Sequence, residues 1–340
     1  MHMHKYGVLI GRFQPFHNAH LETVRFALEH VERLIIVLGS HNRARDIRNP
    51  WSTDERVTMI DSCLSHDDNE RIEFVKASDY DYNDLLWVAT VQEAIHEVTN
   101  GSTDVKLIGH RKDATSFYLN LFPQWGDHIE TGISMNVDAS KVREMMFGLD
   151  TIGIKDMVPS NVYGMLITYM STPEFKRLHD EYHDILADKV AWSGAPYQPT
   201  FVTTDAIVIC SGHVLVVRRR GRYGKGLIAL PGGYIKPSES IQNGCIRELK
   251  EETGIKIDSQ TLRTHCVDSH VFDNPTRDLR GRVITHAFCF RLLDGELPRV
   301  KGMDDADRAW WMPLRTVWAS EEKFFCDHFH IINSFCNRMS

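Results

Sequence analysis

One segment in the second half of this chain, residues 233–255, constrains its fold and chemistry more than any other. It carries two glycines, one arginine and four glutamates at fixed spacing: Gly233, Glu239, Arg247, Glu248, Glu251, Glu252 and Gly254. On a helix, Glu248 precedes Glu251 and Glu252 by three and four residues, so the three carboxylates project toward one side. A hard divalent cation such as Mg²⁺ relieves their mutual repulsion. The pattern therefore predicts a metal-binding helix, with a solvated charged helix as the alternative.

This spacing matches the Nudix box, and residues 200–340 resemble a Nudix hydrolase. The resemblance implies an α/β/α fold that cleaves the pyrophosphate bond of a nucleoside diphosphate linked to another group. It identifies Glu248, Glu251 and Glu252 as metal ligands and the last two as catalytic, with Mg²⁺ as the cofactor and Mn²⁺ as a substitute. The catalytic base on a separate loop stays open among four acidic residues: Asp304, Asp305, Glu321 and Glu322.

The substrate of this half is predicted from residues 272–282, which resemble a stretch that ADP-ribose pyrophosphatases carry between their later strands. Its arginines, Arg277, Arg280 and Arg282, are expected to bind phosphates or stack on the adenine of ADP-ribose. An ordinary polar hairpin loop is the alternative interpretation of the segment. At the level of function, the alternatives are another dinucleotide substrate or a sensor that binds ADP-ribose or NAD without cleaving it.

A second pattern lies near the N-terminus, where an apolar run at residues 6–10 leads into Gly11-Arg-Phe-Gln-Pro-Phe-His17 and then His20. The run predicts a buried strand, and Gly11 lets a nucleotide approach the backbone. His17 and His20 fall on the first turn of the following helix, beside free backbone N–H groups. This arrangement suits a triphosphate. Zinc is the rival ligand, but the spacing is not that of a zinc protease.

The segment resembles the HxGH nucleotidylyltransferases, and more closely the nicotinamide mononucleotide adenylyltransferases of the archaeal type. Ala19 replaces the family glycine between the histidines. In the related Ser/Thr-rich motif, Asp138 and Ala139 replace hydroxyl residues, whereas Ser140 and Arg143 remain. The resemblance implies catalytic roles for Arg12, His17, His20 and Arg143. It implies an ATP site made of Gly11, Arg12, Phe13, His17, His20, Gly109, Lys112, Ser140 and Arg143.

The resemblance also implies a pocket for nicotinamide mononucleotide. Its expected residues are Asn49, Trp51, Asn83 and Trp87, and a cationic nicotinamide ring near a tryptophan is physically reasonable. The order of the two halves is that of the bifunctional nicotinamide mononucleotide adenylyltransferase/Nudix hydrolases. Such enzymes join ATP and nicotinamide mononucleotide to give NAD and pyrophosphate, and hydrolyse ADP-ribose to AMP and ribose 5-phosphate. A different phosphate ester remains an alternative substrate of the first half.

Length and patterning predict two domains in these 340 residues. Residues 1–192 are expected to form a doubly wound parallel α/β domain with closing helices, 193–199 a linker, and 200–340 the Nudix domain. The net charge of -7 argues against a nucleic-acid partner, and no apolar run reaches the roughly 20 residues of a membrane span. The seven scattered cysteines indicate a reducing compartment, so we expect a cytoplasmic enzyme, and we expect it to form a homo-oligomer.

The predicted elements can be compared directly with the structure. Strands are expected at 6–10, 34–39, 72–75, 105–109, 129–135, 201–210, 214–219, 264–272 and 282–292. Helices are expected at 17–30, 52–64, 84–98, 115–122, 140–147, 160–170, 173–192 and 239–253.

Overall fold

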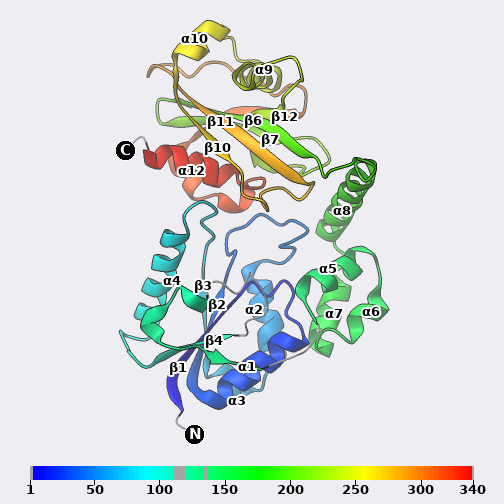
Figure 1. Ribbon diagram of the computed structural model, residues 1–340, viewed down its shortest axis with the longest axis vertical. Helices are drawn as coiled ribbons and strands as arrows, with labels where there is room; N and C mark the ends of the chain where they lie inside the picture. The colour runs from blue at the N-terminus through cyan, green and yellow to red at the C-terminus, as the bar shows by residue number, and fades with distance from the viewer. Residues whose placement is uncertain (1–2, 110–118, 133–136, 339–340) are drawn as a thin grey trace. The chain divides into compact units, whose positions relative to one another are not determined.

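The computed structural model (Figure 1) describes residues 3–109, 119–132 and 137–338. The chain separates into two compact units, Met1–His179 and Asp180–Ser340. This division falls inside helix α8 (Pro173–Ala191), upstream of the linker predicted at 193–199. Helix α8 therefore contributes residues to both units.

The N-terminal unit is built on a parallel five-stranded sheet of order β3-β2-β1-β4-β5. Its strands are β1 (His4–Gly11), β2 (Val31–Leu38), β3 (Ile72–Lys76), β4 (Val105–Gly109) and β5 (Ile129–Glu130). The remaining elements are α1 (Asn18–His30), α2 (Thr53–Asp61), α3 (His66–Asn69), α4 (Asp84–Val98), η2 (Pro123–Trp125), α5 (Ala139–Phe147), α6 (Thr151–Lys155) and α7 (Ser160–Tyr169).

Helices cover both faces of this sheet, and β2 is therefore buried along most of its length. Ile35 and Val37 of β2 pack in one core cluster with Val91 and Ile95 of α4. Figure 1 shows α4 on one side of the sheet and α1 and α2 on the other. The predicted doubly wound parallel fold is confirmed, and the carboxyl ends of β1, β2 and β4 meet at one edge, where ligands bind in such folds.

The C-terminal unit holds a mixed seven-stranded sheet, with β10-β11-β6-β7-β12 in order, β8 beside β7 and β9 beside β6. Its strands are β6 (Thr200–Cys210), β7 (His213–Arg219), β8 (Ile228–Ala229), β9 (Gly232–Tyr234), β10 (Cys266–Phe272), β11 (Arg282–Arg291) and β12 (Ala306–Pro313). Its other elements are α9 (Ile241–Thr253), α10 (Ser259–Thr264), α11 (Leu314–Trp318), η3 (Glu321–Lys323) and α12 (His328–Arg338).

The alternation of side chains along β6 gives this sheet two cores. Val208 packs with Leu249 of α9 on one face, and Ile207 packs with Ile332 and Phe335 of α12 on the other. Figure 1 shows α9 and α10 on one side and α12 on the other, which confirms the predicted α/β/α Nudix fold.

Several local predictions differ from the structure. The glutamate helix begins at Ile241 rather than at 239, because Ser240 caps it by accepting a hydrogen bond from the Asn243 N–H. β12 and α12 were not predicted. The helix predicted at 115–122 and the extended segment at 129–135 lie partly outside the described residues. In the described part of the chain, no helix is long and apolar enough to cross a membrane.

Candidate active sites

The histidine pair lies directly after β1, at the first turn of α1. His17 caps the helix: its Nδ1 accepts from the backbone N–H of His20 at 3.4 Å, and its own backbone N–H donates to His20 Nδ1 at 3.3 Å. The two rings stack with their centroids 3.5 Å apart, and His17 is only 5% exposed. The cap therefore fixes both imidazoles at the positive end of the helix, where an anion binds favourably.

The Phe13 ring packs against His20 of this pair. It is buried, its ring centroid lies 4.8 Å from that of His20, and its backbone has a φ of 52°. A non-glycine residue held in the left-handed region is uncommon and often marks a functional loop. A Cβ at Gly11 would lie 2.8 Å from the Phe13 ring, so the loop can close this tightly only with glycine there.

Arg143 of α5 joins the same loop. Its guanidinium donates to the carbonyl oxygen of Gln14 and, at 3.1 Å, to the Ser140 hydroxyl. Burial, followed by the nearby positive charges of Arg12 and Arg48, lowers the pKa of Arg143 to about 10. Positive charges held close together beside a helix N-terminus suit a polyphosphate. Arg48 was missed in the sequence because it lies outside every recognised motif.

Arg56 was also missed, and it holds the strand ends together. Its side chain is fully buried and donates to the carbonyl oxygens of Arg12 at 2.6 Å and Gly39 at 2.8 Å. It also donates to the Ser40 carbonyl at 3.3 Å. One guanidinium therefore fixes the loops after β1 and β2, and desolvation lowers its pKa to about 10. In the sequence, only its position directly after the capping box of Ser52 and Glu55 indicates that Arg56 lies on a helix.

Two buried polar atoms lie without partners beside this edge. Asn49 Oδ1 and Trp51 Nε1 have no hydrogen-bond partner among the described residues. Trp51 is 3% exposed, and its backbone exchanges two hydrogen bonds with the Gln14 side chain, at 2.8 and 3.1 Å. Buried polar groups without partners are rare in proteins, so these two atoms indicate a place for ligand groups.

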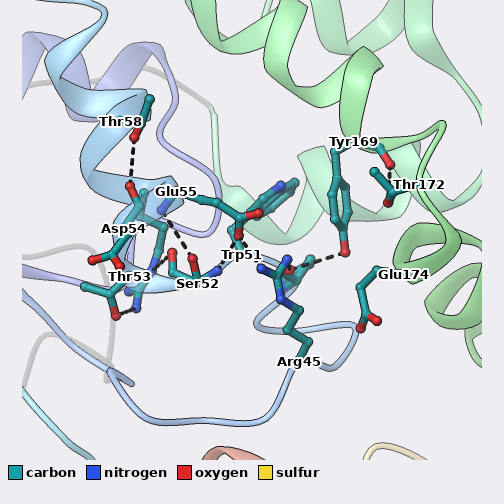
Figure 2. A network of polar contacts seen from close by, with 12 residues as sticks. Arg45, Trp51, Ser52, Thr53, Asp54, Glu55, Thr58, Tyr169, Thr172 and Glu174 are labelled. Carbon is teal, nitrogen blue, oxygen red and sulfur yellow. Dashed lines mark hydrogen bonds and ion pairs between the residues drawn. The ribbon is translucent and has the colours of Figure 1, made fainter.

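Figure 2 shows the network that holds this segment. Arg45 donates to the Pro50 carbonyl at 3.0 Å and pairs with Glu55 at 2.8 Å. The Tyr169 hydroxyl donates to the same carbonyl at 3.2 Å, and burial raises the pKa of that phenol. Glu55 also accepts from the Ser52 N–H, which completes a capping box on α2. The segment from Asn49 to Ser52 is thus fixed from both sides.

The other predicted nucleotide residues lie further along the sheet edge. Asn83 caps α4, because its side-chain oxygen accepts from the Leu86 N–H at 3.0 Å. Trp87 packs edge-on against Phe122, with centroids 5.9 Å apart. Gly109 ends β4, whereas Lys112 lies outside the described residues.

In the C-terminal unit, Arg247 forms ion pairs with three glutamates of residues 233–255. It pairs with Glu239 at 2.6 Å and with Glu248 and Glu251 at 2.7 Å each. It also donates to the Tyr234 carbonyl at 3.3 Å. This network holds the helix against β9, where a Cβ at Gly233 would lie 2.9 Å from the Glu248 carboxylate.

Glu252 faces the inside of the site. It is 7% exposed, and its carboxylate accepts from the Gly232 N–H at 3.0 Å. Burial is the largest cause that raises its pKa to about 8, and the neighbouring Glu248 and Asp205 charges add to it. Burial likewise raises the pKa of Glu248. Buried carboxylates that repel one another form a donor set that fits a hard divalent cation.

In the described part of the chain, no three His, Cys, Asp or Glu side chains are grouped closely enough to hold a metal ion as they stand. The reason is visible in the hydrogen bonds, because Arg247 engages Glu248 and Glu251 while Glu252 bonds to Gly232. The role of the three glutamates as metal ligands is therefore a proposal.

A pocket adjoins Glu252. Its lining residues come from β6, β7, β9, α9 and α12 and from the loops before β8, β11, β12 and α12: Thr203, Asp205, Arg219, Gly221, Gly232, Gly233, Tyr234, Glu252, Arg277, Asp278, Arg280, Asp305, Phe325, Cys326 and His328. Of the four acidic residues considered for the catalytic base, Asp305 lines this pocket. Glu321 instead lies 3.5 Å from His330.

The three arginines predicted to bind ADP-ribose have different surroundings. Arg277 forms a buried pair with Asp327 through two 2.8 Å hydrogen bonds, and Arg280 pairs with Asp278 at 2.6 Å. Both line the pocket, but an aspartate already balances each charge. Arg282 donates to the Asp273 carbonyl and is not among the lining residues.

Arg219 is the pocket arginine that the sequence analysis missed. Its Nε donates to the Tyr223 carbonyl at 2.9 Å, and its guanidinium lies 4.1 Å from the Phe325 ring centroid. No carboxylate of the described residues lies within ion-pair distance of it, and burial together with Arg280 lowers its pKa. Of the three pocket arginines, Arg219 therefore has the charge best placed to meet an anionic ligand.

Comparisons with known families agree with both sites. A cytidylyltransferase-like family model matches residues 8–145, and a NUDIX domain model matches residues 200–333. The fold and the two sites thus define a nucleotidyltransferase joined to a Nudix hydrolase, a class whose hydrolase part needs a divalent metal.

Similar proteins narrow this class. A nicotinamide/nicotinic acid mononucleotide adenylyltransferase from Acinetobacter baylyi is 37% identical over 182 residues, which cover 54% of this chain and 95% of that protein. An ADP-ribose pyrophosphatase from Methanocaldococcus jannaschii is 33% identical over 134 residues, which cover 39% of this chain and 72% of that protein.

A crystal structure spans the whole chain. The bifunctional NMN adenylyltransferase/ADP ribose pyrophosphatase from Francisella tularensis, complexed with AMP and a Mn ion, is 32% identical with a TM-score of 0.93. It covers 99% of this chain and 100% of its own. The chain belongs to the family of bifunctional NMN adenylyltransferase/ADP-ribose pyrophosphatases, and the predicted class of enzyme is confirmed.

Proposed function

We propose that the N-terminal unit joins ATP and nicotinamide mononucleotide to form NAD and pyrophosphate. The observation that carries this proposal is the fixed His17–His20 pair at the N-terminus of α1, next to the buried, partnerless atoms of Asn49 and Trp51. The first feature suits a triphosphate and the second suits the nicotinamide nucleotide. The Acinetobacter baylyi relative supports this substrate pair by its name.

In this reaction, the 5′-phosphate of nicotinamide mononucleotide attacks the α-phosphate of ATP, and pyrophosphate leaves. The chain supplies mainly position and positive charge, as phosphoryl-type transfers require. Arg12, His17, His20 and Arg143 contact the phosphates, and Ser140 orients Arg143 through the 3.1 Å hydrogen bond. Arg56 contacts no substrate but fixes the loop that carries Arg12.

We infer that the C-terminal unit hydrolyses ADP-ribose to AMP and ribose 5-phosphate. The supporting observation is the pocket that joins Glu252 to three arginines beside an intact glutamate helix. Glu248, Glu251 and Glu252 would hold Mg²⁺, with Mn²⁺ as a substitute, and a bound cation would neutralise the pyrophosphate and activate water. Arg219 binds the phosphates, whereas Arg277 and Arg280 shape the pocket walls.

The substrates are tested directly with the purified enzyme. We expect NAD from ATP and nicotinamide mononucleotide, and AMP from ADP-ribose, each dependent on added Mg²⁺ or Mn²⁺. Parallel reactions with nicotinic acid mononucleotide and with other dinucleotides measure the preference at each site. Chromatography that shows no NAD, or no AMP, contradicts the corresponding half of the proposal.

The remaining predictions concern the cellular location, the oligomeric state and the partners of the enzyme. All seven cysteines lie among the described residues and no disulfide joins them, which supports a reducing, cytoplasmic location. A homo-oligomer without nucleic-acid or membrane partners stays a prediction, and light scattering at micromolar concentration measures the oligomeric state.

A further inference from the structure

The loop between β7 and β8, residues 220–227, forms one wall of the hydrolase pocket. Gly221 lines the pocket, and the Tyr223 carbonyl accepts the Nε hydrogen of Arg219 at 2.9 Å. The Tyr223 ring lies 5.2 Å from the Arg280 guanidinium. This loop therefore accepts a hydrogen bond from Arg219, and it packs against Arg280, which Asp278 holds in place.

The second half of α8 belongs to the same compact unit and holds this loop through its carboxylates. Glu181 accepts from the Gly224 N–H at 3.2 Å, and Asp188 accepts from the Tyr223 hydroxyl. Asp188 also pairs with Arg222 at 3.1 Å. Glu181 and Tyr223 are only 6% and 8% exposed, so these hydrogen bonds are worth more than ordinary surface pairs.

The loop packs closely against Phe325. Gly224 has a φ of +58°, and a Cβ there would lie 2.2 Å from the Phe325 ring. Phe325 in turn lines the pocket and packs against the guanidinium of Arg219. The loop is thus packed between α8 on one side and a wall of the pocket on the other.

We propose that Glu181 and Asp188 are positioning residues of the hydrolase, which hold residues 220–227 so that Arg219 meets the substrate. This inference rests on the proposed hydrolysis of ADP-ribose. It extends the working hydrolase to part of α8, outside the matched NUDIX region 200–333 and outside the domain predicted at 200–340.

Steady-state kinetics of the full-length enzyme test the proposal. We expect Glu181→Gln and Asp188→Asn each to raise the KM for ADP-ribose about tenfold, with kcat within about threefold of wild type, because a neutral amide oxygen accepts a weaker hydrogen bond than a carboxylate. NAD formation by the same samples should be unchanged. Tyr223→Phe should raise KM similarly, and adding it to Asp188→Asn should cause less than the product of the two effects.

Asp307→Asn is the matched control, because Asp307 pairs with the exposed Arg218 away from the pocket lining and its loss should leave KM unchanged. A wild-type KM in both helix variants overturns the proposal. So does a parallel loss of both activities, which would assign the contacts to overall stability. If wild type releases no AMP, the proposed function fails instead, and calorimetric affinity for ADP-ribose then replaces KM in the same comparison.

Discussion

The two active sites anchor their charged side chains in different ways. In the N-terminal unit, the buried guanidinium groups of Arg56 and Arg143 donate to backbone carbonyl oxygens at the strand ends. In the C-terminal unit, Arg247, Arg277 and Arg280 pair with carboxylates of other side chains. In the first site, hydrogen bonds to the backbone therefore hold the arginines in place. In the second site, ion pairs with carboxylates hold them.

This difference matches the chemistry of each site. Adenylyl transfer depends on the alignment of two nucleotides, so rigid loops at the ends of parallel strands are what it needs. A metal-dependent hydrolase must bind a cation among acidic groups, so a network that can exchange one positive partner for another is suitable. The comparison predicts that changes of charge mainly affect hydrolysis, whereas changes in backbone support mainly affect transfer.

The largest effect is expected from Glu252→Gln. The substitution keeps the shape of the side chain but removes a proposed metal ligand in the pocket. We expect the kcat for ADP-ribose to fall about 100-fold or more, with NAD formation unchanged. The control is Glu296→Gln, which alters an exposed acid between β11 and β12 that does not line the pocket and should leave both activities intact. Hydrolysis within a few-fold of wild type in Glu252→Gln would show that the metal site is elsewhere.

Arg56→Met tests the backbone support of the transferase site. The variant leaves the carbonyls of Arg12 and Gly39 without their buried donor, which should cost about 3 kcal/mol of stability in that unit. Transferase activity should then disappear at a lower urea concentration, while the urea dependence of hydrolysis stays the same. Arg33→Met, at an exposed position of β2, is the control. Equal sensitivity of Arg56→Met and wild type would contradict this role.

A smaller effect concerns pH in the absence of metal. Burial raises the pKa of Glu252 to about 8, whereas an unfolded glutamate titrates near 4.3. Between these values the unfolded chain has lost the proton that the folded protein keeps, so stability should fall as pH rises through this window. The slope is at most about 1.4 kcal/mol per pH unit.

Urea unfolding in EDTA at pH 5.5 and pH 8 measures this dependence. Glu252→Gln should remove its share of the slope, and the exposed control Glu296→Gln should keep it. An unchanged slope in Glu252→Gln would mean that other groups cause the dependence. Added Mn²⁺ should also reduce the slope, because a bound cation favours the ionised carboxylate.

Most of the fold could be predicted from the sequence because its signals are local. The apolar run before Gly11, the capping box of Ser52 and Glu55, and the spacing of the glutamate helix all act within a few residues. β12 and α12 were missed, since Trp310 and Ile332 are placed by packing against distant strands rather than by a local pattern.

The site residues also differ in whether a local sequence pattern identifies them. The motifs showed His17 and Glu252, but not the residues that act through tertiary contacts. Arg56 and Arg219 resemble ordinary arginines in the sequence, and only the fold places one under two strand ends and the other in a pocket. Asp327, which balances Arg277, lies 50 residues away along the chain and has no local sequence signature.

The most direct test of this account is a double assay of His17→Ala. NAD formation and ADP-ribose hydrolysis are measured on one sample of the variant, beside wild type and the exposed control His66→Ala. We predict that His17→Ala lowers NAD formation about 100-fold or more and leaves AMP release at the wild-type rate, the reverse of Glu252→Gln. NAD formation at the wild-type rate, or an equal loss of both activities, would contradict two separately built sites.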